Sequence, residues 1–475
     1  MKIFNKIKSS SLSKLGVYSL FKIVTYLISI ISLPVLTQKF SVANYGIISL
    51  LESTITLIVS FCLVGLPQAY IRYYEIEKKE GRIKTYNSST YFLIFLILCI
   101  TFVISFIIVK ETYDIKLAFI IATITALTVS NQQLSSFFRA RGSLYLHASL
   151  TGLNEIGAFL FPLITVVFFI PDINTYFLSK LFVCIIYYLI IIVMLKPTIS
   201  REDLEFDILK KLLFYGMPLL LLSVGSTIYS NGDRVVIHLL YGEEMVAYYS
   251  VPAKLSHALQ QVLIYPISMV IFPQYVSIWE KSGKEKTKKY LNRGLNLYIF
   301  IICPIIMGSI IIRKDLILLL SDERYLQADY LIPILVISLL VYGIYYFVAS
   351  GFFLHNKTLL LGAVMGGTAL INIFLNFILG YMWGVLGIGI ATAIAYILFL
   401  FICSNISSKI IKLDFPMKNT AFFSIKAFIM FLILKAINIQ MKSSIMNIVF
   451  NIILGGGIYL ILNIRYIKKV IKEEN

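Results

Sequence analysis

The stretch Tyr91–Lys110 reads YFLIFLILCITFVISFIIVK, and it decides the fold class. It is apolar apart from a few hydroxyl groups, and its one charge stands at the last position. The hydrocarbon core of a bilayer is about 30 Å thick, so a helix needs about 20 apolar residues to cross it. This stretch therefore predicts a membrane-spanning helix.

Comparable apolar runs recur along the whole chain, and their number and length predict an all-α, polytopic membrane protein of about 14 transmembrane helices. The pair near 212–240 and 246–275 is the hardest to bound, because both runs are long and partly polar. The predicted spans are residues 15–36, 45–66, 89–109, 117–138, 148–170, 174–195, 212–240, 246–275, 294–313, 329–351, 358–379, 384–405, 420–438 and 445–464.

The composition agrees with this assignment, since 59% of the 475 residues are hydrophobic and only 14% are charged. A soluble globule of this size could not hide so much apolar surface. The formal charge of +18 would suggest nucleic acid in a soluble protein. Here the basic residues fall in the connections between apolar runs, where they orient a membrane protein, so we expect no nucleic-acid partner.

The positions of the lysines and arginines also predict the orientation. If the N-terminus is cytoplasmic and every run crosses once, 29 of the 36 basic residues outside the spans lie on the cytoplasmic side. Only seven fall in outside loops, and dropping one span destroys the asymmetry. Both termini are therefore expected in the cytoplasm. The high content of isoleucine, lysine and asparagine suggests a bacterial source, and hence a bacterial cytoplasmic membrane. The seven outside residues are Lys39, Lys110, Lys116, Arg313, Lys314, Arg324 and Lys442.

Several functional classes lack their usual signals. The cysteines lie one by one in separate apolar runs, without a CxxC or Cys/His cluster, so we expect neither a metal site nor a disulfide framework. There is no Walker A sequence, and all connections are short, which leaves no room for a soluble catalytic domain. We therefore expect no enzyme activity and no cofactor. The cysteines are Cys62, Cys99, Cys184, Cys303 and Cys403.

The chain also matches itself at an offset of 215 residues. Phe137-Phe138 falls on Phe352-Phe353, and Gly152 falls on Gly367, among further apolar matches. Chance matching among apolar letters is one interpretation. The other is two six-helix lobes related by an axis along the membrane normal, as in many transporters. It predicts an N-terminal lobe over 1–200, a C-terminal lobe over 201–412, and two added helices with a cytoplasmic tail over 413–475.

The sequence resembles the oligosaccharide flippases (Wzx-type polysaccharide exporters) of the multidrug/oligosaccharidyl-lipid/polysaccharide exporter (MOP) superfamily. The resemblance covers nearly the whole chain, although its motifs are degenerate. The stretches that carry it are FSVANYGIISL (Phe40–Leu50), GLPQAYIRY (Gly65–Tyr73), Met217–Leu255 with Asp233-Arg234 and YGEEMVAYYSVPAKL, LLLSDERYLQADYLIPIL within Leu316–Leu335, and GVLGIGIATAIAY (Gly384–Tyr396).

The resemblance implies a two-lobed fold with a central cavity, and a polyprenyl-pyrophosphate-linked oligosaccharide as cargo for surface polysaccharide assembly. Its partners would be the cargo, membrane lipids and a polysaccharide polymerase. Other cargoes of the superfamily stay open, above all the lipid-linked peptidoglycan precursor. A drug exporter would be expected to have twelve spans and an acidic cavity. A membrane polymerase or ligase would be expected to have large outside loops.

Charges inside predicted spans are costly in lipid, and they usually face a cavity or a partner. Lys22, Arg234 and Lys254 fall on helices that the family would place around its cavity. With Arg72 at the cytoplasmic mouth, they are our candidates for binding the pyrophosphate, because cationic donors can replace its hydration water. The alternative for Arg234 is a structural ion pair with an acid such as Asp233 or Glu52.

Three carboxylates, Asp233, Glu52 and Glu155, are candidates for coupling transport to a proton or Na⁺. The alternative is again a structural ion pair. Lys180 and Lys435 stand near the ends of spans, where we expect long side chains to reach water.

Overall fold

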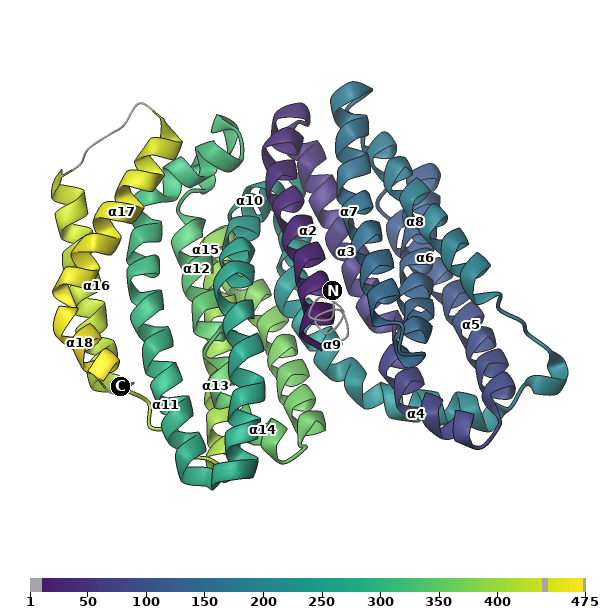
Figure 1. The fold of residues 1–475 in the computed structure, drawn as a ribbon. Helices are drawn as coiled ribbons and strands as arrows, with labels where there is room; N and C mark the ends of the chain where they lie inside the picture. The colour runs from purple at the N-terminus through teal and green to yellow at the C-terminus, as the bar shows by residue number, and fades with distance from the viewer. Residues whose placement is uncertain (1–10, 438–442, 473–475) are drawn as a thin grey trace, which may run out of the picture. The chain divides into compact units, whose positions relative to one another are not determined.

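The structure is a computed structural model that describes residues 11–437 and 443–472, and it consists of helices and their connections throughout this part. Figure 1 shows their arrangement. The α-helices are α2 (Ser11–Lys39), α3 (Val42–Cys62), α4 (Leu66–Lys79), α5 (Ile83–Lys110), α6 (Ile115–Ala140), α7 (Leu144–Phe168), α8 (Ile173–Leu195), α9 (Phe206–Tyr241), α10 (Glu243–Leu259), α11 (Tyr265–Leu320), α12 (Leu331–Tyr342), α13 (Tyr345–Val348), α14 (Ser350–Leu354), α15 (Thr358–Ser408), α16 (Met417–Ile437), α17 (Ser444–Leu462) and α18 (Ile464–Lys472).

Three shorter helical turns complete the described elements. They are the 3₁₀ turns η1 (Arg201–Asp203) and η3 (Glu323–Ala328) and the π-helical turn η2 (Gln260–Ile264).

The predicted all-α membrane fold is confirmed. The described residues contain eleven helical stretches that are long and apolar enough to cross a membrane. Two of these stretches are double, because the backbone leaves helical geometry at Gly283 in α11 and at Trp383-Gly384 in α15. Both glycines have a positive φ, which a residue without a Cβ adopts without strain. With each of these stretches divided, and α2 added, the described helices account for all fourteen predicted spans.

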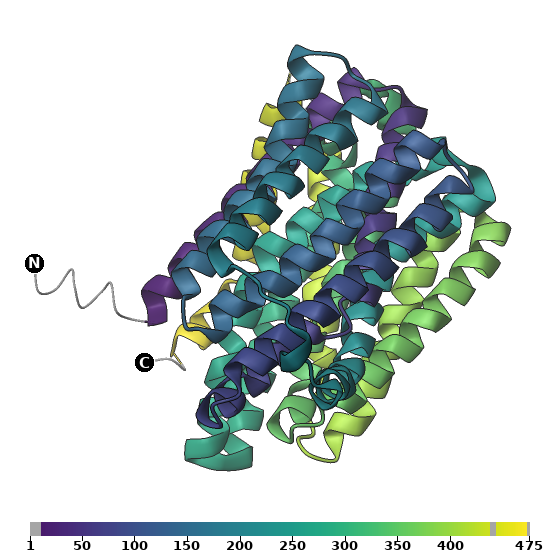
Figure 2. The same ribbon diagram turned by 90° about the vertical axis from the view of Figure 1, so that its right-hand side faces the viewer.

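The chain forms two compact units, residues 1–235 and 236–475, and their boundary lies inside α9. In the first unit α2 packs on α7, α5 packs on α6, and α8 packs against both α6 and α7. Figure 2, which faces this unit, shows the purple and blue helices running roughly parallel to one another. This arrangement buries the small and hydroxyl-bearing face of α6.

In the second unit α12 packs on α15, and α16 and α17 pack on α11. The yellow α16 and α17 lie beside α11 in Figure 1. The connection from α15 to α16 is tied to α11 by Asp414, whose carboxylate accepts a bond from Lys288 Nζ at 2.8 Å. This bond holds the pKa of the Asp414 carboxyl below its usual value. The division into 1–200, 201–412 and 413–475 stays a prediction, as does the repeat behind it.

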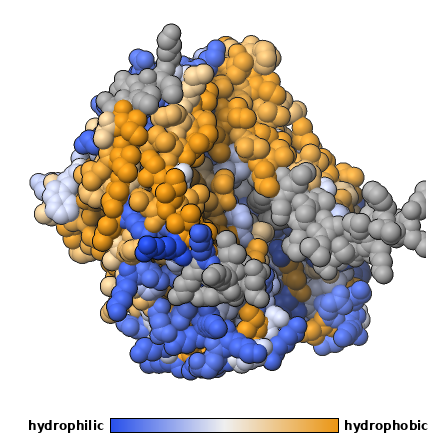
Figure 3. Space-filling model, turned by 60° about the vertical axis from the view of Figure 1, so that its left-hand side comes forward, coloured by the Kyte–Doolittle hydropathy of each residue, from blue (hydrophilic) through white to orange (hydrophobic). Residues whose placement is uncertain are grey.

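The surface of the helices suits a hydrocarbon solvent. Large apolar side chains such as Phe95, Ile104 and Phe428 are 55%, 40% and 49% exposed. In Figure 3 the apolar residues cover the upper part of the face shown, and hydrophilic residues gather at its lower end. Hydroxyl groups inside the spans bond to the preceding turn, as when Thr101 donates to the Ile97 carbonyl at 2.7 Å. Such bonds satisfy polar groups that lipid cannot.

The break between α3 and α4 fixes the position of α9. Gly65 stands there with φ +63°, and its Cα faces the backbone of Gly216 on α9. A Cβ on Gly65 would meet the Gly216 carbonyl, and one on Gly216 would meet the carbonyl of Val64. The two helices therefore touch backbone to backbone, which only glycine permits at both positions.

A charged cluster also links α4 to α9, near the end of α4 and the start of α9. The carboxylate of Glu77 on α4 is fully buried. It accepts bonds from Arg82 Nη2 at 2.8 Å and from Lys211 Nζ on α9 at 2.7 Å. The buried charge of Glu77 holds the pKa of the Arg82 guanidinium above its usual value. A buried carboxylate needs such partners, so α4, α5 and the start of α9 form one charge-balanced corner.

We predict that Gly216→Val destabilises the protein by about 1–3 kcal/mol, the usual cost of overpacking a close contact. The added side chain cannot avoid the Val64 carbonyl, because both partners are backbone atoms. Thermal unfolding of the purified protein in detergent measures the effect. Gly457→Ala is the matched control, since a Cβ there meets nothing within 4 Å. Equal unfolding temperatures of the two variants would contradict the close approach.

Candidate functional site

Asp233 and Arg234 lie side by side on α9, and both are almost completely buried, at 4% and 5% exposure. Arg234 donates from Nη1 to the Ser230 carbonyl at 2.8 Å, one turn earlier on the same helix. Its guanidinium also acts electrostatically on the hydroxyl of Tyr45 in α3. An arginine in a span is expensive to desolvate, so it must meet polar groups or a polar ligand. Its burial agrees with either predicted role.

Glu52 lies on α3, seven residues after Tyr45, and forms an ion pair with Lys180 of α8. Tyr176 Oη donates to the same carboxylate at 3.2 Å. Lys180 is only 15% exposed, so it is paired inside the unit instead of extending alone to water. Glu52 thus pairs with Lys180, and not with Arg234 as one alternative predicted. Tyr176 lies within electrostatic reach of Tyr45 as well.

Arg234 lies within electrostatic reach of Tyr45, and Tyr45 within reach of Tyr176, while Glu52 bonds with Tyr176 and Lys180. The charged and hydroxyl groups of α9, α3 and α8 thus form one polar row inside the first unit. The row runs from Arg234 through Tyr45 and Glu52 to Lys180. It contains two cations and one carboxylate, with Asp233 adjacent on α9. Arginine and lysine donors are suited to pyrophosphate oxygens, and the carboxylates are suited to a proton or a cation. The sequence identified three of these charges, but it gave no sign that tyrosines join them.

The other predicted site residues lie elsewhere. Arg72 is exposed on α4, and Glu155 is half-buried on α7, where it acts electrostatically on Tyr187. Lys254 is half-buried on α10 and belongs to the second unit. The side chain of Lys22 lies outside the described residues. The structure therefore brings Asp233, Arg234 and Glu52 into one row, whereas the roles of Arg72, Lys22, Lys254 and Glu155 stay predictions.

A buried polar cluster in the second unit was missed. Asn372, Asn376 and Thr392 of α15 are at most 4% exposed. Asn372 Nδ2 lies 3.4 Å from Asn376 Oδ1 and 3.3 Å from Thr392 Oγ1. Asn372 Oδ1 accepts no hydrogen bond from the described residues. Such oxygens suit a hard cation. The available signal is the pair of asparagines four residues apart in an apolar run, which carry no charge and so stand out less than Arg234 does.

The described residues contain no group of three or more histidine, cysteine or acidic side chains that could hold a metal ion. The five cysteines are unpaired thiols in the structure.

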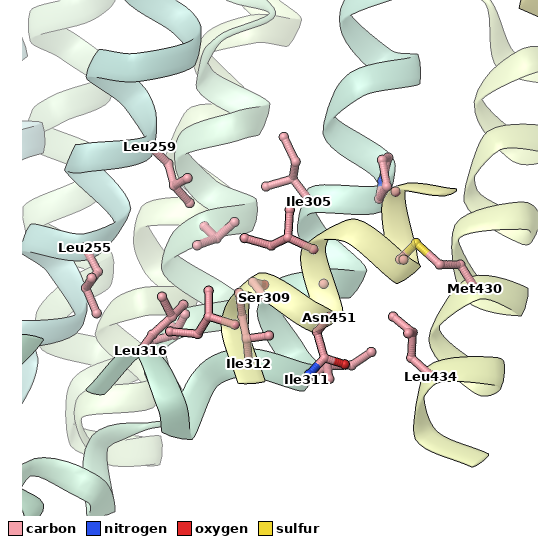
Figure 4. A pocket seen from close by; sticks show the side chains of 18 of the residues that line it. Leu255, Leu259, Ile305, Ser309, Ile311, Ile312, Leu316, Met430, Leu434 and Asn451 are labelled. Atoms are coloured by element: carbon pink, nitrogen blue, oxygen red, sulfur yellow. The ribbon is translucent and has the colours of Figure 1, made fainter. Parts of the chain in front are cut away.

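The second unit also contains an apolar cavity of about 480 Å³, which Figure 4 shows from close by. Leu255 and Leu259 face it from one side, and Met430 and Leu434 of α16 face it from the other. Segments of α10, η2, α11, α12, α16 and α17 together form its wall. Ser309 and Asn451 are the polar side chains among its lining residues. A cavity of this size and polarity is suited to a hydrocarbon chain.

The sequence matches the family model described as polysaccharide biosynthesis protein over residues 11–279. The match spans more than half of the chain. The chain belongs to this polysaccharide biosynthesis family. The resemblance to flippases of the MOP superfamily is thereby confirmed, and the protein is a multi-pass membrane protein of that superfamily.

Two relatives of this family member have curated descriptions. An uncharacterised membrane protein of Methanocaldococcus jannaschii is 25% identical over 376 residues, covering 72% of this chain and 73% of the relative. A probable low-salt glycan biosynthesis flippase of Haloferax volcanii is 19% identical over 236 residues, which is 50% of each chain. The two relatives are thus described as a membrane protein and as a probable flippase.

Solved structures show the same fold. The lipid II flippase MurJ in an inward closed conformation superposes with a TM-score of 0.76 at 17% identity, covering 96% of this chain and 99% of MurJ. An inward-facing multidrug resistance transporter of the MATE family gives 0.64 at 13% identity, covering 84% and 98%. At these identities the likeness concerns the fold alone, and the site residues have to be judged from this chain.

We predict that Lys180→Met destabilises the protein more than the double variant Glu52→Gln with Lys180→Met. The single change leaves a carboxylate without its cation in a half-buried place, and the double change removes both charges. A double-mutant cycle on thermal unfolding should give a coupling of about 1–3 kcal/mol. Strict additivity of the two single changes would show that the ion pair contributes nothing.

Proposed function

We propose that this protein is a flippase that moves a polyprenyl-pyrophosphate-linked oligosaccharide across the bacterial cytoplasmic membrane for surface polysaccharide assembly. Both termini would face the cytoplasm, as the distribution of basic residues predicts. The family membership and the flippase among the relatives support a transporter of lipid-linked glycans. The two lobes would alternate access by moving against each other, a scheme common to transporters built from repeated halves.

One structural observation carries the cargo class, namely the apolar cavity of about 480 Å³. A lipid-linked sugar has a long hydrocarbon chain and a charged, hydrated head. The cavity takes only the first of these, since its wall offers Ser309 and Asn451 as polar groups and no charge. We propose that it holds part of the polyprenyl chain while the head passes elsewhere. A small cationic drug would need acidic groups that this wall lacks.

We propose that cationic side chains bind the head group, beginning with the buried Arg234. Arg234 offers a planar donor set that matches phosphate oxygens, and its burial means that little water competes for it. Lys22, Lys254 and Arg72 complete the proposed anion path. Asp233, Glu52 and Glu155 remain the proposed coupling carboxylates. Among them Glu52 already neutralises Lys180, so its protonation would free a second cation for the cargo.

The runner-up cargo is the lipid-linked peptidoglycan precursor, because it has the same polyprenyl pyrophosphate and the lipid II flippase shares the fold. A membrane polymerase or ligase is disfavoured, since the described part of the chain has only short segments outside its helices. A polymerase partner stays a proposal that follows from the pathway class.

The test is translocation in proteoliposomes. Lipid-linked oligosaccharide and lipid-linked peptidoglycan precursor are incorporated separately, and their accessibility to an added glycosidase or lectin is followed over time. We expect the oligosaccharide to change leaflets with unchanged mass. Selective movement of the peptidoglycan precursor would favour the runner-up, and a change in the mass of either lipid would indicate an enzyme.

We predict that Arg234→Ala reduces this translocation by at least about tenfold, since a charged hydrogen bond contributes roughly 1.5–3 kcal/mol. Arg234→Lys should retain part of the rate, because it keeps the charge and loses the bidentate geometry. Lys435→Ala is the control, as Lys435 is an exposed cation on α16. Full activity of correctly inserted Arg234→Ala protein would remove Arg234 from the anion path.

A further inference from the structure

The end of α10 and the turn η2 carry a polar row through a span. Ser250, Lys254, His257 and Gln261 follow one another at intervals of four, three and four residues. In a helix this spacing places side chains on one face. Ser250 is buried, Lys254 and His257 are half-buried, and Gln261 is exposed. The row thus becomes more accessible from Ser250 toward Gln261.

The same segment supplies one wall of the apolar cavity through Leu255, Ala258, Leu259 and Val262. Lys254, His257 and Gln261 are each followed directly by one of these cavity-lining residues. Successive side chains in a helix are separated by about 100° around its axis. The polar row and the cavity wall are therefore neighbouring faces of one helical segment.

The two faces reach the surface together at η2. Val262 is 65% exposed although it lines the cavity, so the cavity is open there. Gln261, the residue before it, is exposed as well. The π-helical turn Gln260–Ile264 is wider than an α-helical turn, and such turns are frequent at functional sites. His257 and Gln260 meet across its start, with Nδ1 and Oε1 3.2 Å apart.

An exposed carboxamide in a membrane span is costly if it faces acyl chains, because neither its N–H groups nor its oxygen find partners there. The cost disappears if the polar row faces hydroxyl groups and water. A carboxamide with both donor and acceptor atoms also matches the hydroxyl groups of a sugar, which need both. Beside an open apolar cavity, this arrangement fits a ligand that is hydrocarbon on one side and sugar on the other.

We infer that the α10–η2 segment is the divider between the two halves of the cargo, with Val262 and Leu259 against the polyprenyl chain. Gln261, which follows the His257–Gln260 pair, contacts the first sugar next to the pyrophosphate. This inference rests on the proposed function and deepens it. It assigns sugar recognition to a π-helical turn. The pyrophosphate that joins the sugar to the polyprenyl chain would lie at the same turn, toward Lys254 of the polar row.

Site-specific photocrosslinking in cells that make the full-length protein tests the inference. A benzoylphenylalanine is placed at position 261, at position 262 or at position 401. After irradiation, adducts are digested and mapped by mass spectrometry. We expect both 261 and 262 to capture the lipid-linked sugar, attached through the sugar at 261 and through the isoprenoid at 262. Phe401 is 64% exposed on α15, away from the cavity lining, and should capture ordinary phospholipid.

A second measurement covers the case in which the bulky probe disturbs the turn. Gln261→Leu should reduce translocation in proteoliposomes about tenfold, since the hydrogen bond of the carboxamide to the sugar is lost. Gln261→Asn, which keeps the carboxamide, should recover part of the rate. Phe401→Leu is the control, and it should translocate like the unchanged protein.

The outcomes separate the inference from the function on which it rests. Suppose that the unchanged protein translocates the lipid-linked sugar but position 261 captures only acyl or isoprenoid chains. The inference about the α10–η2 segment is then wrong, and the proposed flippase function is unaffected. Full activity of Gln261→Leu would overturn the sugar contact in the same way. If the unchanged protein translocates nothing, the proposed function itself fails, whatever position 261 captures.

Discussion

The hydrocarbon solvent is the constraint on which the rest of this structure depends. Lipid offers no hydrogen bonds, so every backbone N–H and C=O in a span must be satisfied within the chain, and helices do this one segment at a time. The same rule extends to side chains. Hydroxyl groups such as that of Thr101 bond to their own helix, and the charges of Glu52 and Lys180 meet each other. Polar groups inside the spans are consequently few and specifically placed.

Because polar groups are few inside the spans, those that are present are candidates for a function. The first unit contains a row of charges from Arg234 to Lys180, in which the Tyr176 hydroxyl donates to Glu52 and Tyr45 lies within electrostatic reach of Arg234. The second unit contains an uncharged polar cluster around Asn372 and an apolar cavity. A protein that only had to be stable in lipid would gain little from these features, because burying ions costs more than burying hydrocarbon. These are the features on which the proposed lipid-linked cargo rests.

The comparisons show how fold and site separate. A flippase and a multidrug transporter superpose on this chain at 17% and 13% identity. Apolar spans tolerate exchange among similar side chains as long as length and small-residue contacts, such as Gly65 against Gly216, are kept. Cargo choice is decided by the few polar and cavity-lining positions, which fold similarity does not report.

The sequence by itself determined the spans, because a run such as Tyr91–Lys110 satisfies its backbone locally and needs no distant partner. It also singled out buried charges such as Arg234, since a charge in an apolar run is conspicuous. Only the tertiary structure decided which partner each polar group has. Lys180 pairs with Glu52, which lies 128 positions earlier in the sequence. The cavity is lined by residues as far apart in the sequence as Leu255 and Gly456. Pairing and cavity shape depend on how helices pack side against side, and an apolar sequence leaves many such packings open.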